Sequence, residues 1–183
     1  MENTINIEVT KALLPLAAEK DIRQYLNGVY IDFQHDKTIY VATNGHMLGI
    51  YTESVENERT FNIIIPRDVV KQLKPKSGKA KWGKLSFDPE SKSGRVINPA
   101  NGQDFGFIPP AGVYPDYTHV IPDKTSGGAG QFNAEYLYAF AQVNKALGAK
   151  YPGIFKIDHN GEQGAIVHLS DDRFTGIIMP CRV

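Results

Sequence analysis

Apolar and polar residues alternate in short runs along most of the chain, a pattern typical of half-buried β-strands. The first run, residues 5–9, precedes a helical apolar pattern over residues 11–17, for which Thr10 is the expected N-cap. Pro15 removes a backbone donor inside that helix and predicts a kink. Strand-like runs follow at residues 24–33, 38–43 and 47–52. Asn44-Gly45, between the last two runs, predicts a tight turn.

The same order of elements then begins again. Residues 61–65 form a β-branched run, and Pro66 leads into a short helical pattern over residues 67–74 that Pro75 ends. Three more strand-like runs follow, at residues 80–88, 94–98 and 104–108. Residues 109–122, rich in Pro, Gly and Tyr, are expected to form an extended connector.

A third repetition starts after Ser126-Gly127-Gly128, the most linker-like part of the chain. Gln131-Phe132 is expected to close a strand, and Asn133 to cap a helix that ends at Gly148. The apolar face of this helix is Leu137, Phe140, Val143, Asn144 and Leu147. Strands are expected at residues 154–158, 165–169 and 174–180. Three units of one strand, one helix and three strands predict an α+β fold with antiparallel sheets and helices on one side.

The composition is that of an ordinary folded protein whose net charge creates no strong electrostatic field. Of its 183 residues, 42% are hydrophobic and 22% charged, and 20 basic residues balance 20 acidic ones. If the protein binds nucleic acid, it would therefore do so through a local basic face rather than through its net charge. The single cysteine, Cys181, excludes an internal disulfide and fits a reducing compartment. The polar N-terminus is unlike a signal peptide, and no apolar run reaches membrane-spanning length, so a soluble cytoplasmic protein is expected.

Residue patterns for catalysis or metal binding do not stand out. The chain has no phosphate-cradling glycine loop, and its five histidines lack metal-ligand spacing. Asp171-Asp172 and the pair Asp32 and Asp36 are better explained as solvated turn residues. We therefore expect no enzyme, no cofactor and no metal. A small enzyme with a dispersed site is the least favoured hypothesis, and its obvious candidates are His46, Asp32 and Asp171.

Several short segments are more distinctive together than alone. They are residues 23–28 (RQYLNG), 41–48 (VATNGHML), 64–67 (IIPR), 114–122 (YPDYTHVIP) and 177–183 (IIMPCRV). In this order they resemble segments of the bacterial DNA polymerase III beta subunit family, the replicative sliding clamps. The matching blocks reach from about the first helix to the last residue, and the final Met-Pro-x-Arg-aliphatic block adds specificity.

This resemblance implies the DNA-clamp fold, in which repeated units form a ring with helices lining the hole. Residues 1–122, as units 1–60 and 61–122, look like the family's middle domain. Residues 123–183 look like the second half of its last domain. The family's first domain and the first half of its last domain have no counterpart here, which suggests a compact relative from a phage or mobile element.

The resemblance also implies a groove for clamp-binding peptides of polymerases and clamp-loader subunits. The positions that match the family's groove are Leu26, Thr43, Gly45, His46, Met47, Leu48, Pro122, Ile177, Ile178, Met179, Pro180, Arg182 and Val183. Met47 stands where the family usually has a basic residue, Asn44 replaces a common Asp, and Cys181 replaces an apolar residue. A peptide preference different from that of other clamps is therefore expected. Individually, Leu26, Leu48 and Ile177 are better explained as core residues of their strands, whereas for the whole set the groove is favoured.

Double-stranded DNA is the second partner that the resemblance implies, bound without sequence preference through phosphates. The basic residues on or beside the helices are Lys11, Lys20, Arg23, Arg67, Lys71, Lys74, Lys76, Lys145 and Lys150. For any one of them, a solvated surface role is the simpler explanation. The family's ring has about twelve units, so four copies of a three-unit chain would close a homo-oligomeric ring by pairing sheet edges.

Two functional hypotheses thus remain open. The first is a non-catalytic processivity or recruitment factor that encircles or sits on DNA. The second is a monomeric adaptor or competitor that captures clamp-binding peptides without forming a ring. A discrete oligomer in solution favours the first, and a stable monomer that still binds peptide favours the second.

Overall fold

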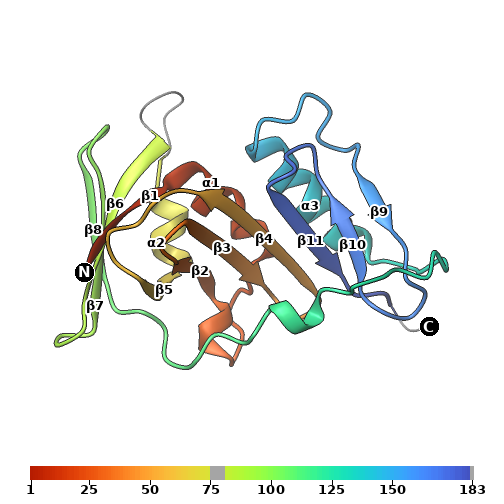
Figure 1. The fold of residues 1–183 in the computed structure, drawn as a ribbon, viewed down its shortest axis with the longest axis horizontal. Helices are drawn as coiled ribbons and strands as arrows, with labels where there is room; N and C mark the ends of the chain where they lie inside the picture. Colours follow the sequence, from red (N-terminus) through yellow and green to blue (C-terminus); the bar gives the residue numbers. More distant parts are fainter. Residues whose placement is uncertain (75–80, 182–183) are drawn as a thin grey trace.

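Two antiparallel sheets form the framework of the protein (Figure 1). The structure, a computed structural model, describes residues 1–74 and 81–181. The four-stranded sheet has the order β1-β6-β7-β8 and consists of β1 (Glu2–Asn6), β6 (Trp82–Asp88), β7 (Ser93–Asn98) and β8 (Gln103–Phe107). The seven-stranded sheet has the order β5-β2-β3-β4-β11-β10-β9. Its strands are β2 (Gly28–Phe33), β3 (Lys37–Thr43), β4 (Met47–Ser54), β5 (Phe61–Pro66), β9 (Lys156–Asp158), β10 (Ala165–His168) and β11 (Phe174–Ile178).

The helices gather on one face of the large sheet. They are α1 (Ile7–Ala12), α2 (Arg67–Gln72) and α3 (Ala134–Ala146), with 3-10 turns at Leu14–Leu16, Gln24–Leu26 and Thr118–Val120. Residues of all three helices pack in one core cluster with Val29, Tyr40 and Val167 of the sheet. A second cluster on the opposite face contains Leu48, Ile50 and Tyr114 but no α-helical residue. The predicted α+β fold with helices on one face is confirmed.

The first two units exchange their leading strands. Strand β1 precedes α1 in the chain but pairs with β6, and β5 precedes α2 but pairs with β2. Each unit therefore contributes an edge strand to the sheet of the other. The third unit joins the first within the same chain, because β11 pairs antiparallel with β4 from Phe174 opposite Tyr51 to Ile178 opposite Met47.

Two glycines lie opposite each other at the seam between β4 and β11. Gly176 pairs with Gly49. A Cβ atom on Gly49 would overlap the Leu16 side chain, and one on Gly176 would lie 2.6 Å from the Phe140 ring. The absence of side chains at this pair therefore lets helix-side residues pack directly against the backbone where the units meet.

Two local predictions near helix starts were wrong. The N-cap of α1 is Asn6, whose side chain accepts a hydrogen bond from the Val9 amide, whereas Thr10 lies inside the helix and donates its hydroxyl to the Asn6 carbonyl (2.8 Å). The strand expected at Gln131-Phe132 is absent from the described chain, so the third unit consists of α3 followed by three strands. The helix predicted over residues 67–74 ends earlier, at Gln72. The first residue of the predicted strand 80–88 lies outside the described residues, and β6 begins at Trp82.

Replacing Asn6 with alanine is expected to lower the free energy of unfolding by about 2–3 kcal/mol, because two functions are lost together. The side chain is buried, caps α1, and donates from Nδ2 to Oε1 of the buried Glu53 (3.1 Å). The matched control is Asn133→Ala, which removes the N-cap of α3 at an exposed site and should cost only about 1 kcal/mol. Equal losses in urea unfolding would contradict the role assigned to Glu53.

No helix within residues 1–74 and 81–181 is both long and apolar enough to cross a membrane.

Candidate functional site

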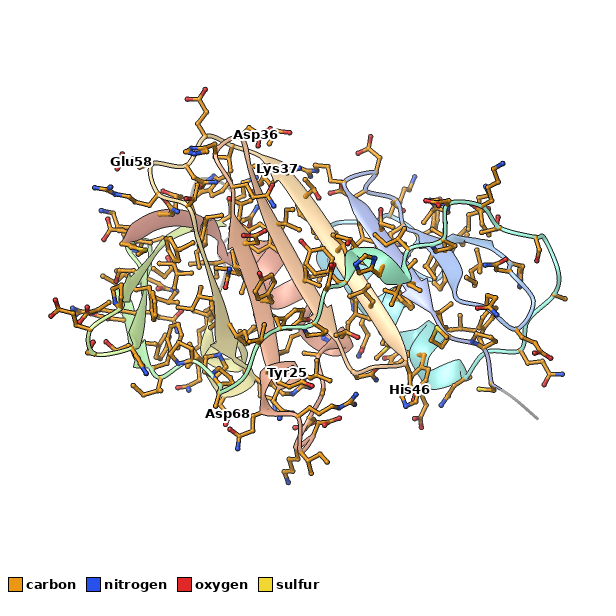
Figure 2. All side chains as sticks on the ribbon, turned by 60° about the horizontal axis from the view of Figure 1, so that its bottom comes forward. Tyr25, Asp36, Lys37, His46, Glu58 and Asp68 are labelled. Carbon is orange, nitrogen blue, oxygen red and sulfur yellow. The ribbon has the colours of Figure 1, made fainter. Side chains whose placement is uncertain are left out.

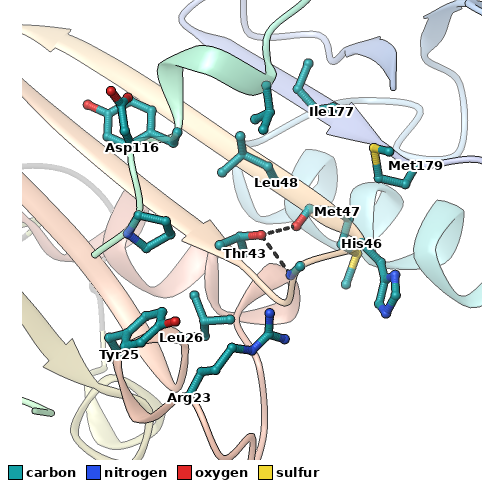
Figure 3. A pocket seen from close by; sticks show the side chains of 14 residues that line it. Arg23, Tyr25, Leu26, Thr43, His46, Met47, Leu48, Asp116, Ile177 and Met179 are labelled. Atoms are coloured by element: carbon teal, nitrogen blue, oxygen red, sulfur yellow. Dashed lines mark hydrogen bonds between the residues drawn. The ribbon is translucent and has the colours of Figure 1, made fainter. Parts of the chain in front are cut away.

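An apolar pocket opens where the β3–β4 turn, the connector before α3 and the end of β11 meet (Figure 3). Its volume is about 250 Å³. The lining residues are Arg23, Tyr25, Leu26, Thr43, Gly45, His46, Met47, Leu48, Pro115, Asp116, Tyr117, Val120, Ile177 and Met179. Segments far apart in the sequence thus build one concave site. Two of the lining residues, Tyr25 and His46, lie along the same border of the molecule in Figure 2.

A network of short hydrogen bonds fixes the β3–β4 turn. The Thr43 hydroxyl donates to the Met47 carbonyl (2.7 Å) and accepts from the Gly45 amide (3.0 Å), as Figure 3 shows. The Asn44 side chain accepts from the amides of His46 and Met47. Gly45 has a φ of +90°, which favours glycine. The Asn44-Gly45 turn predicted from the sequence is confirmed, and it presents its backbone at the pocket.

The floor of the pocket is aliphatic. Leu26, Leu48 and Ile177 are almost fully buried and belong to the core cluster on the helix-free face of the sheet. Met47 is also buried, whereas the Met179 side chain is 40% exposed. The Met179 amide donates to the His46 carbonyl (2.9 Å) and so continues the β4–β11 pairing beyond the strand. Because Met47 packs in the helix-side core, the flexible thioether over this rigid aliphatic floor is that of Met179, and it suits an apolar ligand group.

The connector forms one wall of the pocket and is anchored by aromatic stacking. Tyr114 is buried and stacks on Tyr30 of β2 with ring centroids 4.4 Å apart. Tyr117 meets the same ring edge-on at 6.3 Å. Burial raises the pKa of Tyr30 and of Tyr117 to about 12, so both stay neutral at ordinary pH. This anchoring holds Pro115, Asp116 and Val120 at the pocket.

Charges of both signs lie at the rim. Arg23 forms an ion pair with Asp21 (2.8 Å), and the hydrogen bonds from Arg23 lower the pKa of Asp21 to about 2. On the opposite wall, hydrogen bonds from Thr118 lower the pKa of Asp116. These groups therefore keep their charges at neutral pH, a state suited to orienting a polar ligand rather than to exchanging protons with it.

The third unit touches the pocket rim through an aromatic contact. The His46 ring stacks on Tyr136 of α3, with centroids 5.7 Å apart and planes inclined by 13°. Because Tyr136 lies outside the lining, it acts on the pocket through His46. The position of α3 thus bears on the shape of the rim.

The structure brings together many, but not all, of the groove residues predicted from the resemblance. The lining contains Leu26, Thr43, Gly45, His46, Met47, Leu48, Ile177 and Met179. Ile178 is fully buried in the helix-side core, since neighbouring strand residues point to opposite faces. Pro122 is not among the lining residues, and Pro180 lines a separate hollow with Gly130 and Gly161. Arg182 and Val183 lie outside the described residues.

Sequence reasoning did not assign six lining residues to the groove. Tyr25, Pro115, Asp116, Tyr117 and Val120 were not proposed for any site, and Arg23 was considered only for DNA. The signal was present for most of them. Residues 114–122 resemble a family segment, and the run of Tyr and Pro indicates a connector that packs on a surface rather than a free linker.

Four of the nine predicted DNA-facing residues make contacts inside the protein. The ammonium group of Lys11 donates to the carbonyls of Lys71 and Leu73 at the end of α2. Arg67 is largely buried and donates to the Leu14 (2.8 Å) and Ala17 (3.0 Å) carbonyls. Lys71 pairs with Glu19 at 2.8 Å, and Arg23 with Asp21. Lys20, Lys74, Lys145 and Lys150 are exposed, and Lys76 lies outside the described residues.

The residues considered for catalysis have local structural partners. Asp32 accepts a hydrogen bond from the Gln34 side chain (2.8 Å). Asp171 is bonded to Arg173 and to the Tyr51 hydroxyl, and the Arg173 contact lowers its pKa. Within the described ranges, no group of three or more His, Cys, Asp or Glu side chains is placed to hold a metal ion.

Comparison with known sequences identifies a family relationship. Residues 5–81 match the model of the DNA polymerase III beta subunit, central domain. A beta sliding clamp of Pseudomonas putida is 30% identical over 148 residues, and one of Treponema pallidum is 26% identical over 144 residues. Both alignments cover 75% of this chain but only 37% of the relative. The chain thus matches well under half of the length of these relatives.

Solved structures with the same fold extend the likeness to the whole chain. The DNA polymerase III subunit beta of Pseudomonas aeruginosa aligns with a TM-score of 0.76 at 17% identity. A sliding clamp of the same organism bound to griselimycin aligns with a TM-score of 0.66 at 14% identity. Each alignment covers 100% of this chain and 66% of the other. The predicted DNA-clamp fold is confirmed.

Proposed function

We propose that this chain is a clamp-like replication factor that recruits partners by binding their peptides. The premise is its relationship to the bacterial DNA polymerase III beta subunits, whose central-domain model matches residues 5–81. The protein would have no catalytic activity of its own. Its place of action would be the cytoplasm, where bacterial and phage DNA is replicated. The observation that carries this proposal is the apolar pocket between the β3–β4 turn, the connector and Met179.

The shape of the pocket favours part of an extended peptide over a whole small molecule. At about 250 Å³ it falls below the usual range of roughly 300–1,000 Å³ for small-molecule sites. One or two aliphatic or aromatic side chains would fill it, while the peptide backbone continues over the rim. The exposed turn backbone and the side chains of Arg23 and Asp116 offer polar partners of both kinds.

Contact with DNA would be weak and electrostatic. Of the predicted basic residues, Lys20, Lys74, Lys145 and Lys150 are exposed and remain candidates for phosphate contacts. The side chains of Lys11 and Arg67 donate hydrogen bonds to backbone carbonyls and are therefore poor candidates for phosphate contacts. We propose that encirclement, rather than affinity, would retain the protein on DNA, so binding should fall steeply as salt increases.

The domain layout and the ring are part of the same proposal. Residues 1–122 would correspond to the family's middle domain, and residues 123–183 to half of its last domain. A ring of four copies follows from the number of units in the family's ring. Native mass spectrometry over a range of concentrations would test it, and a protein that stays monomeric would argue against encirclement.

A second candidate function has its own support in the structure. One chain alone is enough to form the pocket, so peptide capture would not require a neighbouring subunit. A monomeric adaptor or competitor could therefore bind clamp-binding peptides and redirect replication. A stable monomer that binds such peptides would favour this candidate over the ring.

The test of peptide binding uses fluorescence anisotropy with a labelled peptide that carries the clamp-binding motif of a bacterial replicative polymerase. Saturable binding to the full chain is expected, and an unlabelled copy of the same peptide should compete. A scrambled peptide of identical composition is the control. If both labelled peptides bind equally or neither binds, the recruitment function is wrong for this groove.

A further inference from the structure

A second hollow, the connector hollow, lies where the two sheets and the connector meet. Its volume is about 250 Å³, the same as that of the pocket. Strands β2 and β5 of the large sheet line it through Tyr30 and Ile64, and β6 of the small sheet lines it through Phe87. The connector contributes Pro109, Pro110 and residues 112–114. Neither the proposed peptide pocket nor the exposed lysines involve this hollow.

The connector hollow and the pocket adjoin along the connector. Tyr114 lines the hollow, and the next residue, Pro115, lines the pocket. Tyr25, which also lines the pocket, packs against Gly112 of the hollow, where a Cβ atom would lie 2.6 Å from the Tyr25 ring. Figure 1 shows the connector, in green, leading from β8 to the 3-10 turn at Thr118–Val120. A single extended chain lying along the connector would therefore meet both hollows.

The backbone of the connector offers hydrogen-bonding groups to such a chain. Within the described part of the protein, residues 109–117 take part in no backbone–backbone hydrogen bond. The connector is held instead by its side chains, through the stack of Tyr114 on Tyr30 and the edge-on contact of Tyr117 with the same ring. Its amides and carbonyls are thus available to an extended peptide that runs alongside, as in recognition by strand addition.

We infer that the connector hollow takes an aromatic side chain of the same peptide whose clamp-binding motif occupies the pocket. The peptide backbone would run along the connector between the two. This inference rests on the proposed recruitment function, because it adds a second anchor to that ligand. The partner would therefore be recognised through a segment longer than the motif, with an aromatic residue outside it.

The lining of the connector hollow favours a flat, uncharged side chain. The aromatic rings of Tyr30, Phe87 and Tyr114 and the two adjacent proline rings present surfaces on which another ring stacks or meets an edge. None of the lining residues is charged, so a charged side chain would lose water there without gaining a partner. At the rim, Val113 is 88% exposed, and a bound aromatic residue would cover it.

Fluorescence anisotropy on the full chain with lengthened peptides tests this inference. The reference probe is the labelled peptide that carries the clamp-binding motif of a bacterial replicative polymerase. The test probes extend it at either end by about six glycine and serine residues, roughly 20 Å of extended chain, with one phenylalanine placed at each added position in turn. At one position, phenylalanine should tighten binding by on the order of tenfold relative to serine at the same position.

Two variants locate this gain in affinity. Val113→Asp places a carboxylate at the rim of the connector hollow, so it should remove the gain while leaving the affinity for the reference probe unchanged. The control, Ile154→Asp, introduces the same charge at a site that is 71% exposed and outside the linings of both hollows, and it should keep the gain. Circular dichroism should show that both variants remain folded.

Each other outcome is decisive. If phenylalanine gives no gain at any position, the inference is overturned, while recruitment through the motif stands. A gain that persists in Val113→Asp, or that Ile154→Asp removes equally, also overturns it, because the aromatic residue then binds elsewhere or responds only to overall charge. A reference probe that does not bind the wild type contradicts the recruitment function itself, and the inference falls with it.

Discussion

Replacing Phe140 with alanine is expected to lower the free energy of unfolding by about 3–5 kcal/mol, the range for a fully buried aromatic residue. Phe140 is the central side chain of α3 and has no exposed surface. Its ring meets Phe174 of β11 edge-on, with centroids 6.2 Å apart, and packs against the backbone at Gly176. Urea unfolding followed by circular dichroism would measure the loss.

The control for this prediction lies two residues away on the same helix. Tyr138 is 66% exposed, so Tyr138→Ala should change the free energy of unfolding by no more than about 0.5 kcal/mol. Helix propensity rises in both variants, which makes the pair well matched. If the two substitutions lower the free energy of unfolding equally, α3 is not anchored through Phe140. The packing of α3 on the β4–β11 seam described above would then be contradicted.

Removing the Phe140 side chain should also affect the rim of the pocket. The helix that carries Phe140 also carries Tyr136, which stacks on His46 at the rim. A loosened α3 would therefore free the His46 ring. This coupling links the stability of the third unit to the site built mainly by the first unit.

Local patterns in the sequence predicted the repeated order of elements well. Asn44-Gly45 marked the β3–β4 turn because only a few residue types tolerate a positive φ, and Asn133 marked the start of α3 because its side chain caps the helix. Both signals depend on neighbours along the chain. The same holds for the strands of the four-stranded sheet, whose alternation reflects one buried face, whereas β3 and β4 of the large sheet are buried on both faces.

Features that depend on distant partners were harder to predict. Gln131-Phe132 has a strand-like composition but no strand to pair with, so it remains irregular. Asn6 was overlooked as a cap because Ile5, Ile7 and Val9 continue an apparent alternation, although the helix starts at Ile7. The exchange of β1 and β5 between units could not follow from periodicity, since pairing partners are set by the tertiary fold.

The groove shows the same division between local and distant information. The resemblance assigned both Ile177 and Ile178 to it, but alternation along β11 allows only one to face the pocket, and Ile178 faces the core. Conversely, Asp116 and Tyr117 enter the site through a connector whose path over the sheet is set by the stack of Tyr114 on Tyr30. A resemblance can thus indicate candidate groove positions, whereas the fold determines which of them line the pocket together.

Replacing Met179 with aspartate is expected to weaken binding of a clamp-motif peptide by on the order of a hundredfold. Met179 lines the pocket, and its exposed side chain would be covered by the ligand. A carboxylate there would lose water without gaining a partner when an apolar side chain enters. The fold should persist, because the Met179 amide still bonds to the His46 carbonyl.

Two matched variants separate this effect from a general change of charge or size. Val113→Asp introduces the same charge at a site that is 88% exposed and outside the pocket lining, and should leave peptide affinity unchanged. Met179→Leu keeps an apolar side chain and should bind within about threefold of the wild type. Fluorescence anisotropy compares all three. If Met179→Asp binds as tightly as Val113→Asp, the peptide does not occupy this pocket, and recruitment would have to use another surface of the fold.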